Sequence, residues 1–169
     1  MRLSKAEPIA KPRQAGGGGS RTGRRTQPLL QLGQWILLLL YSAAVIYWMF
    51  LGFGRTVRTE GPLQYNLEPL RTVKLYFNLD NGVTLTGRLV NLLGNVAVFV
   101  PFGLLLPQLF RSLRSIIRLS LWTATGILLL ETAQMLLRVG SFDVDDLLLN
   151  LIGVWTGYFL LRLGRRNKL

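Results

Sequence analysis

The stretch that decides the fold is Asp143-Val144-Asp145-Asp146-Leu147-Leu148-Leu149-Asn150-Leu151-Ile152-Gly153. It places three carboxylates at the start of a hydrophobic segment that continues to Leu163. An ionised carboxylate in or near hydrocarbon is costly unless it is paired, hydrated or turned toward a protein interior. The position of these acids therefore predicts a polar site inside a membrane protein, at one side of the bilayer.

The apolar content of the whole chain supports that class. Half of the 169 residues are hydrophobic, and the net charge of +12 comes mainly from residues between the apolar runs. A spanning helix needs roughly 20 mostly apolar residues, and four segments qualify, at about residues 32–53, 89–110, 119–137 and 147–163. The prediction is an all-α fold, a polytopic membrane protein with a four-transmembrane-helix bundle at residues 30–163.

Two residue types that carry much of enzyme chemistry are missing. The chain contains neither cysteine nor histidine. This excludes disulfides, thiol nucleophiles, histidine bases and imidazole–metal sites, and with them zinc hydrolases of the histidine type and Ser-His-Asp hydrolases. Any chemistry must use carboxylates, amides, hydroxyls, lysine or arginine.

The basic residues predict the orientation. Residues 1–29 and 164–169 are basic flanks, and the first of these lacks a hydrophobic period and is expected to be a disordered tail. Fourteen of the 20 Lys and Arg residues lie in the flanks, at the end of the fourth segment or between the second and third segments. By the positive-inside rule both termini are cytoplasmic, in a multi-pass protein of the inner (cytoplasmic) membrane. The long outer loop, about residues 54–88, is expected to form a short amphipathic element on the outer surface.

Polar residues recur at helical spacing near the outer ends of three segments. The third segment carries Glu131, Gln134 and Arg138, spaced by three and four, which puts them on one helical face. The second and fourth segments carry polar pairs spaced by four. Together these residues predict a polar cup that opens outward. Its expected ligand-binding residues are Asn91, Asn95, Gln134, Arg138, Asp143 and Asn150.

Several of these residues also have an ordinary structural explanation. Asp143 with Asp146 could cap the fourth helix, because acids are favourable at the positive end of a helix. The asparagines and Gln134 could form hydrogen bonds between helices. The small residues in Gly153-x-x-x-Gly157 indicate close helix packing rather than a function.

Glu131 is harder to explain by structure alone. A carboxylate so deep in the bilayer must be paired, for example with Arg138, or protonated. We therefore take Glu131, Asp145 and Asp146 as hypothetical catalytic residues. The same three carboxylates are the hypothetical metal ligands, because carboxylate and amide oxygens suit a hard divalent cation such as Mg²⁺ or Ca²⁺.

The motifs together resemble the VanZ-like family of bacterial membrane proteins, over roughly residues 30–163. Two departures stand out: Glu68 precedes Pro69 where an apolar residue is expected, and Val139-Gly140-Ser141 replaces the Gly-Arg often found before the acidic motif. The resemblance implies a role in the cell envelope, since the founding member is associated with low-level resistance to teicoplanin, a glycopeptide that acts outside the membrane. The motifs are Asn66-Leu67-x-Pro69, Asn91-x-x-Gly94-Asn95, Phe99-x-Pro101-Phe102-Gly103-x-x-x-Pro107, Glu131-x-x-Gln134 and Phe142-Asp143-x-Asp145-Asp146-x-x-x-Asn150-x-x-Gly153-x-x-x-Gly157-Tyr158.

The cup leaves several functions open. The first is an envelope protein that binds a lipid-linked cell-wall precursor or a glycopeptide. The second is a membrane-embedded, metal-assisted enzyme acting on a lipid-linked or cell-wall phosphate or glycosyl substrate. The third is a small oligomeric transporter or flippase. The lipid bilayer is an expected partner and nucleic acid is not, while the oligomeric state and the enzyme status stay open.

Overall fold

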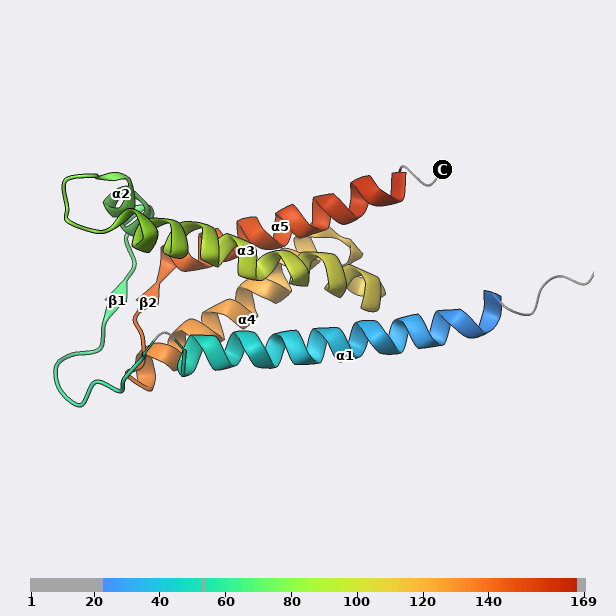
Figure 1. Cartoon of the computed structure of the whole chain (residues 1–169), viewed down its shortest axis with the longest axis horizontal. Coiled ribbons are helices and arrows are strands. Elements are labelled where there is room, and N and C mark those ends of the chain that lie inside the picture. The colour runs from blue at the N-terminus through green and yellow to red at the C-terminus, as the bar shows by residue number, and fades with distance from the viewer. Residues whose placement is uncertain (1–22, 53, 167–169) are drawn as a thin grey trace, which may run out of the picture.

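The computed structural model describes residues 23–52 and 54–166, and it is almost entirely helical (Figure 1). Four long helices run back and forth along the molecule, and a short helix and a pair of two-residue strands lie at one end. In chain order the elements are α1 (Gly23–Phe50), β1 (Tyr65–Asn66), α2 (Arg71–Phe77), α3 (Leu85–Leu109), the 3-10 turn η1 (Arg111–Arg114), α4 (Ile116–Leu136), β2 (Phe142–Asp143) and α5 (Val144–Arg166).

The predicted all-α membrane fold is confirmed. The four spans long and apolar enough to cross a membrane are Pro28–Phe50, Leu85–Leu109, Ile116–Leu136 and Val144–Arg166. They match the four segments expected from the sequence, with ends that differ by a few residues.

The flanks of the bundle are more helical than the sequence suggested. Most of the predicted disordered tail lies outside the described residues, but α1 already begins at Gly23. At the other end α5 continues to Arg166, into the second basic flank. Both boundaries move outward because polar and basic residues can extend a helix beyond its apolar span without loss of backbone hydrogen bonds.

The centre of the bundle is the crossing of α3 and α5, where glycines bring the two backbones into contact. A Cβ atom added at Gly153 would collide with the carbonyl oxygen of Val96, and one added at Gly157 with that of Val100. From the other side, a Cβ atom at Gly103 would meet the backbone of α5. The close packing predicted for the glycine pair is therefore confirmed, and it agrees with the role of small residues between transmembrane helices.

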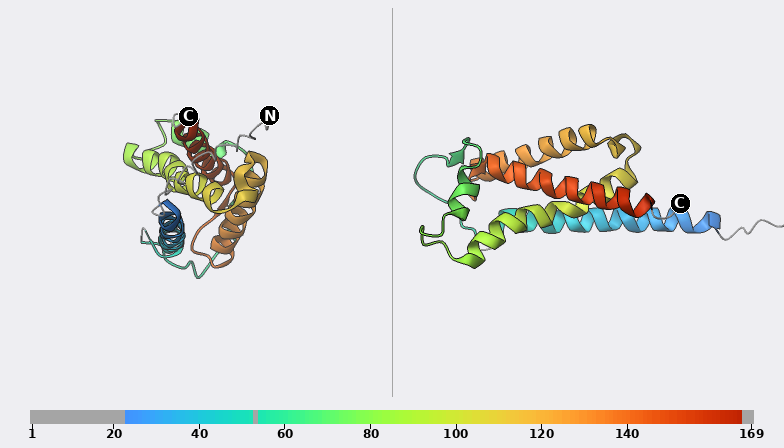
Figure 2. Two further views of the ribbon diagram at one scale, coloured as in Figure 1. Left: turned by 90° about the vertical axis from the view of Figure 1, so that its right-hand side faces the viewer. Right: turned by 90° about the horizontal axis from the view of Figure 1, so that it is seen from above.

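Helix α1 lies at the edge of the bundle (Figure 2). It is attached to α3 by a few polar and aromatic contacts: Tyr41 donates to the carbonyl oxygen of Val98 at 2.9 Å, and Gln34 donates to Gln108 at 3.1 Å. Most of its large apolar side chains are exposed, as expected for a surface covered by lipid.

The loop end, which we define as residues 51–84 and 137–143, closes one end of the bundle. There β1 pairs with β2 in parallel, and this pair joins two loops that are far apart in the sequence. Helix α2 is the short element expected in the outer loop. The adjoining turn is organised by Arg88, which is 5% exposed and donates to the carbonyl oxygens of Tyr76, Asn78 and Val83 and to the side chain of Asn81.

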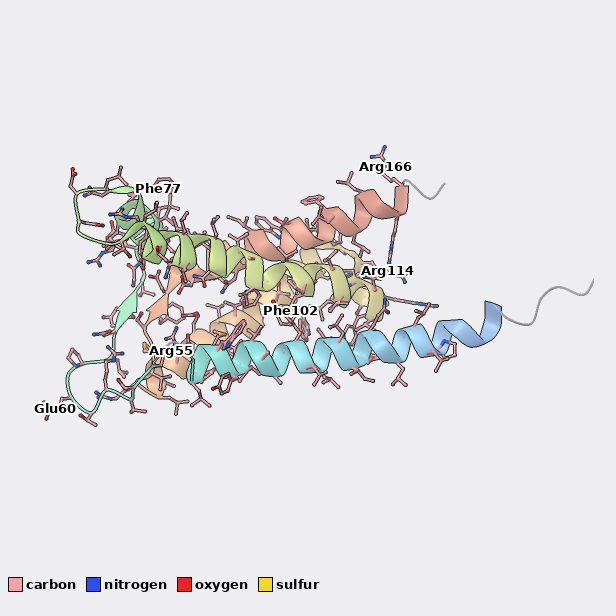
Figure 3. All side chains as sticks on the ribbon, in the orientation of Figure 1. Arg55, Glu60, Phe77, Phe102, Arg114 and Arg166 are labelled. Atoms are coloured by element: carbon pink, nitrogen blue, oxygen red, sulfur yellow. The ribbon has the colours of Figure 1, made fainter. Side chains whose placement is uncertain are left out.

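The opposite end carries the arginines of η1 and of the last turn of α5, and we call it the basic end. Figure 3 shows Arg114 and Arg166 there, whereas Arg55 and Glu60 lie at the loop end. The two ends of the molecule therefore differ sharply in charge.

Candidate functional site

Asp145 anchors the loop end to the bundle. Its side chain is fully buried and accepts hydrogen bonds from the backbone N–H groups of Leu70 at 2.5 Å, Thr72 at 2.8 Å and Val73 at 3.1 Å. These donors belong to the first turn of α2, where a helix leaves N–H groups without partners and favours a negative charge. Asp145 thus caps a helix that precedes it by about seventy residues.

Asp143 joins the same two loops. Its carboxylate accepts from the side chain of Asn66 at 3.0 Å and from the hydroxyl of Thr72 at 2.5 Å. It also accepts from the backbone N–H of Asp145 at 2.9 Å, at the start of α5. The capping role suggested for Asp143 by the sequence is therefore present, and the additional contacts fix the loop between the first two spans over the bundle.

Asp146 points to the other side of α5, where it meets α3 and α2. The side-chain amide of Asn95 donates a short hydrogen bond to it. The phenol of Tyr76 in α2 lies within electrostatic reach. Burial raises the pKa of Tyr76, and the negative charges of Asp146 and Asp143 raise it further. Asp146 is thus the aspartate whose surroundings are side chains rather than backbone N–H groups.

Glu131 lies beside this group with little compensation. It is 3% exposed, it accepts a hydrogen bond from the backbone N–H of Asp143, and its charged neighbours are the carboxylates of Asp146 and Asp143 and the guanidinium of Arg55. Its Oε2 atom has no hydrogen-bond partner among the described residues. Two carboxylates that share a buried site need a proton or a positive charge between them.

The expected pairing of Glu131 with Arg138 is wrong. Helix α4 ends at Leu136, and Arg138 adopts a left-handed conformation with φ of 59°. The face shared by residues three and four apart therefore stops before Arg138. Its guanidinium instead donates to the carbonyl oxygen of Gly61 at 2.7 Å.

Three buried acceptor atoms have no donor in the described part of the chain. They are the side-chain oxygens of Asn91 and Asn150 and the Oε2 atom of Glu131. Gln134, by contrast, donates to the carbonyl oxygen of Met49 at 2.5 Å. It therefore forms a hydrogen bond between α4 and α1, which is the structural role suggested for it by the sequence. Because a buried polar atom without a partner loses its hydration at a cost of about 1–3 kcal/mol, these three acceptors favour a ligand or water that brings donors.

A cavity of about 490 Å³ lies between α1 and α3 at the loop end, and Asn91 is one of its lining residues. Its polar lining is Arg55, Tyr76, Asn91 and Asn95, and Asp146 adjoins it through the bond from Asn95. The remaining wall is mainly apolar and includes Trp48. A large apolar cavity with a few polar groups at one end is the usual form of a small-molecule site.

The structure thus divides the predicted site residues into two sets. In one set Asn91 and Asn95 line the cavity and Asp146 adjoins it, while Glu131 and Asn150 are buried and do not line it. The other set holds elements in place: Gln134, Arg138, Asp143 and Asp145.

The predicted metal site of Glu131, Asp145 and Asp146 does not form as one group. Among residues 23–52 and 54–166 no cluster of three or more acidic side chains is arranged to hold a metal ion. The reason is that Asp145 uses both carboxylate oxygens on the backbone of α2.

Some residues of the site were not anticipated from the sequence. Arg55 and Tyr76 line the cavity but stand alone in a long loop without periodicity. Thr72 likewise offers no signal. Asn66 was marked only by the motif that it shares with Pro69.

The fold and the site define an integral membrane protein with four spanning helices and a buried carboxylate site at one end. The sequence matches the VanZ/LLP1 family over residues 35–165, and the chain belongs to this family. It is 29% identical over 84 residues to Protein VanZ of Enterococcus faecium, a match that covers 50% of this chain and 52% of that protein. The chain thus spans about half the length of the curated relative it matches, and no solved structure matches it.

Proposed function

We propose that this protein acts in the cell envelope by binding the headgroup of an amphiphilic molecule in the cavity between α1 and α3. The observation that carries the proposal is the polar end of that cavity, where Arg55, Tyr76, Asn91 and Asn95 lie and Asn95 bonds to Asp146. Glu131 is buried within electrostatic reach of Asp146 and Arg55. The apolar wall suits the lipid part of such a ligand.

The polar groups favour a particular headgroup chemistry. The amides of Asn91 and Asn95 and the neighbouring carboxylate of Asp146 suit hydroxyl or amine donors, as carried by a sugar. Arg55 at the cavity suits a phosphate, because a guanidinium binds phosphate oxygens with paired hydrogen bonds. A lipid-linked cell-wall precursor combines these features, and binding of such a precursor would give a route to glycopeptide tolerance.

The proposed location follows from the charges. The sequence predicts 14 of the 20 basic residues on the cytoplasmic side, and Arg114, Arg162 and Arg166 among them lie at the basic end, so we propose that this end faces the cytoplasm and the loop end faces outward. The cavity then lies in the outer leaflet of the cytoplasmic membrane, where envelope precursors are used.

A metal-assisted enzyme is the second candidate, and one observation favours it. Glu131 and Asp146 lie close together, with a single arginine among their charged neighbours. A divalent cation between them would take its other ligands from amide oxygens or from a substrate phosphate, as Mg²⁺ often does.

Binding can be measured directly in the purified protein. Trp48 lines the cavity, so its fluorescence should change when a polyprenyl-phosphate-linked disaccharide is added in neutral detergent. Glu131→Gln and Asp146→Asn should each weaken binding at least tenfold. The matched controls Glu60→Gln and Asp80→Asn, at exposed acids of the loop end, should bind as the wild type does.

Analysis of the same mixtures for reaction products, with and without Mg²⁺, distinguishes the two candidates. Product formation that depends on Mg²⁺ would establish the enzyme, whereas binding without turnover supports the binding protein. Unchanged affinity in both site variants, with the protein folded, would show that the buried carboxylates only stabilise helix packing.

A further inference from the structure

A second cavity, of about 280 Å³, lies at the basic end of the molecule. It is formed between the last turns of α5 and the corner where α3 meets η1. The proposal concerns six of its lining residues: Pro107, Arg114, Tyr158, Arg162, Arg165 and Arg166. Four guanidinium groups therefore share one cavity, and none of the described Asp or Glu residues lines it. Like charges that lie together repel each other, so this arrangement is most favourable when an anion is present.

Part of this cavity is held in place by buried contacts. Tyr158 is 5% exposed, and its hydroxyl donates to the carbonyl oxygen of Arg114 at 2.8 Å. Arg162 donates to the same hydroxyl at 2.6 Å and lies over the Tyr158 ring at 5.1 Å from its centroid. Arg114 donates through Nε to the carbonyl oxygen of Pro107 at 3.3 Å. These contacts orient two guanidinium groups from different elements and use only one nitrogen of each.

General functions of basic residues do not account for this arrangement. Arginines at helix ends orient membrane proteins, and Arg165 and Arg166 also suit the negative end of α5. Neither effect needs a shared cavity or an oriented arginine from η1. Arg111 and Arg118 lie toward the same end but do not line the cavity. They therefore serve as controls for the effect of basic charge at this end.

We propose that this cavity binds a phosphate group with net negative charge, of the kind that an anionic phospholipid headgroup presents. Several guanidinium groups converging on one space match the geometry of phosphate oxygens. A water molecule takes up about 30 Å³ of the liquid, so a cavity of 280 Å³ has room for a phosphate with an attached glycerol. The neighbouring side chains Leu160 and Leu163 on α5 are exposed to the bilayer, which places acyl chains beside the headgroup.

The test compares two pairs of substitutions that remove the same charge from the same end. Arg165→Gln with Arg166→Gln changes the cavity, and Arg111→Gln with Arg118→Gln changes arginines outside it. All four side chains are exposed, so both variants should fold. Each protein, in neutral detergent, is titrated with dioctanoyl phosphatidylglycerol, dioctanoyl phosphatidylcholine or inorganic phosphate at constant ionic strength, and the thermal midpoint is recorded.

The wild type should be stabilised by phosphatidylglycerol and not by phosphatidylcholine. An arginine near an anionic headgroup contributes roughly fivefold to affinity, so the cavity pair should weaken the affinity for phosphatidylglycerol about thirtyfold. This affinity is read from the dependence of the thermal midpoint on the lipid concentration. The control pair should weaken it less than threefold. Stabilisation by inorganic phosphate as well would identify the anion itself as sufficient, whereas stabilisation by the lipid alone would assign the site to a headgroup. The proposal is overturned if neither anion stabilises the wild type, or if both pairs lose the response equally.

Discussion

Replacing Asp145 by asparagine tests whether two adjacent aspartates have different tasks. The carboxylate of Asp145 accepts from Leu70 through one oxygen and from Thr72 and Val73 through the other. An asparagine keeps one of these acceptors and turns an NH₂ group toward the remaining N–H donors. The shape of the side chain is preserved, so the loss is confined to hydrogen bonding.

The expected magnitude follows from the number of bonds lost. An asparagine that keeps the oxygen bonded to Thr72 and Val73 loses the Leu70 bond, worth about 1.5–3 kcal/mol with a charged acceptor, and the two bonds kept each weaken to the about 0.5–1.5 kcal/mol of a neutral acceptor, for a total of about 3–6 kcal/mol. Helix α2 has no buried residue of its own, and besides Asp145 it is held by the bonds from Thr72 to Asp143 and from Arg88 to the carbonyl oxygen of Tyr76. We therefore expect α2 to detach locally while the four spans stay folded. Since 1.4 kcal/mol is a factor of ten, the detached population should rise at least about 100-fold.

Amide hydrogen exchange of the protein in detergent measures this population residue by residue. In Asp145→Asn the amides of Leu70, Thr72 and Val73 should exchange at least about 100-fold faster, and those of α4 should keep their protection. Asp146→Asn is the matched control, because Asp146 accepts its bond from Asn95 rather than from α2. Equal protection of α2 in the wild type and in Asp145→Asn would refute the anchoring role, and so would equal loss of protection in the two variants.

Three further predictions follow from the fold. Gly157→Ala should destabilise the bundle by about 1–3 kcal/mol, because its Cβ meets the backbone of α3, whereas Gly164→Ala on the same helix meets open space and should be neutral in a thermal melt. The pKa of Tyr76 should lie above the usual tyrosine range in an absorbance titration, so any stability that depends on its neutral form is lost only as the pH rises through that raised pKa. Asp146→Asn should lower the pKa of Tyr76, and an unchanged titration would contradict the proximity of the two side chains. A cysteine introduced at Glu60 of this cysteine-free chain should react with an impermeant thiol reagent in intact cells, and reaction only after lysis would reverse the proposed orientation.

The spans could be predicted from the sequence because their signal is local. A run of about 20 apolar residues has few alternatives to a membrane helix. The close packing at Gly153 and Gly157 could be predicted in the same way, since small residues at that spacing form one strip along a helix. The position of Arg138 could not be predicted, because a non-glycine residue with positive φ has no sequence signature. In this chain the positive φ of Arg138 takes its side chain off the helical face of α4.

The site was harder to predict because it is assembled from distant segments. The sequence marked both Asp145 and Asp146, but their roles depend on which of them faces α2, and spacing within α5 cannot give that direction. Arg55 and Tyr76 reach the cavity from a loop whose path is set by long-range hydrogen bonds. Periodicity carries no information about such a path.

The anchoring of α2 by Asp145 also sets the order in which the protein can mature. Residues 51–84 leave the ribosome long before α5, and their partners Phe142, Asp143 and Asp145 come from the last part of the chain. The loop between the first two spans must therefore wait, with the first turn of α2 lacking its carboxylate partner, until the fourth span has been inserted. The cavity lining contributed by that loop then settles last, so a chain released before α5 could enter the membrane and still lack a finished site.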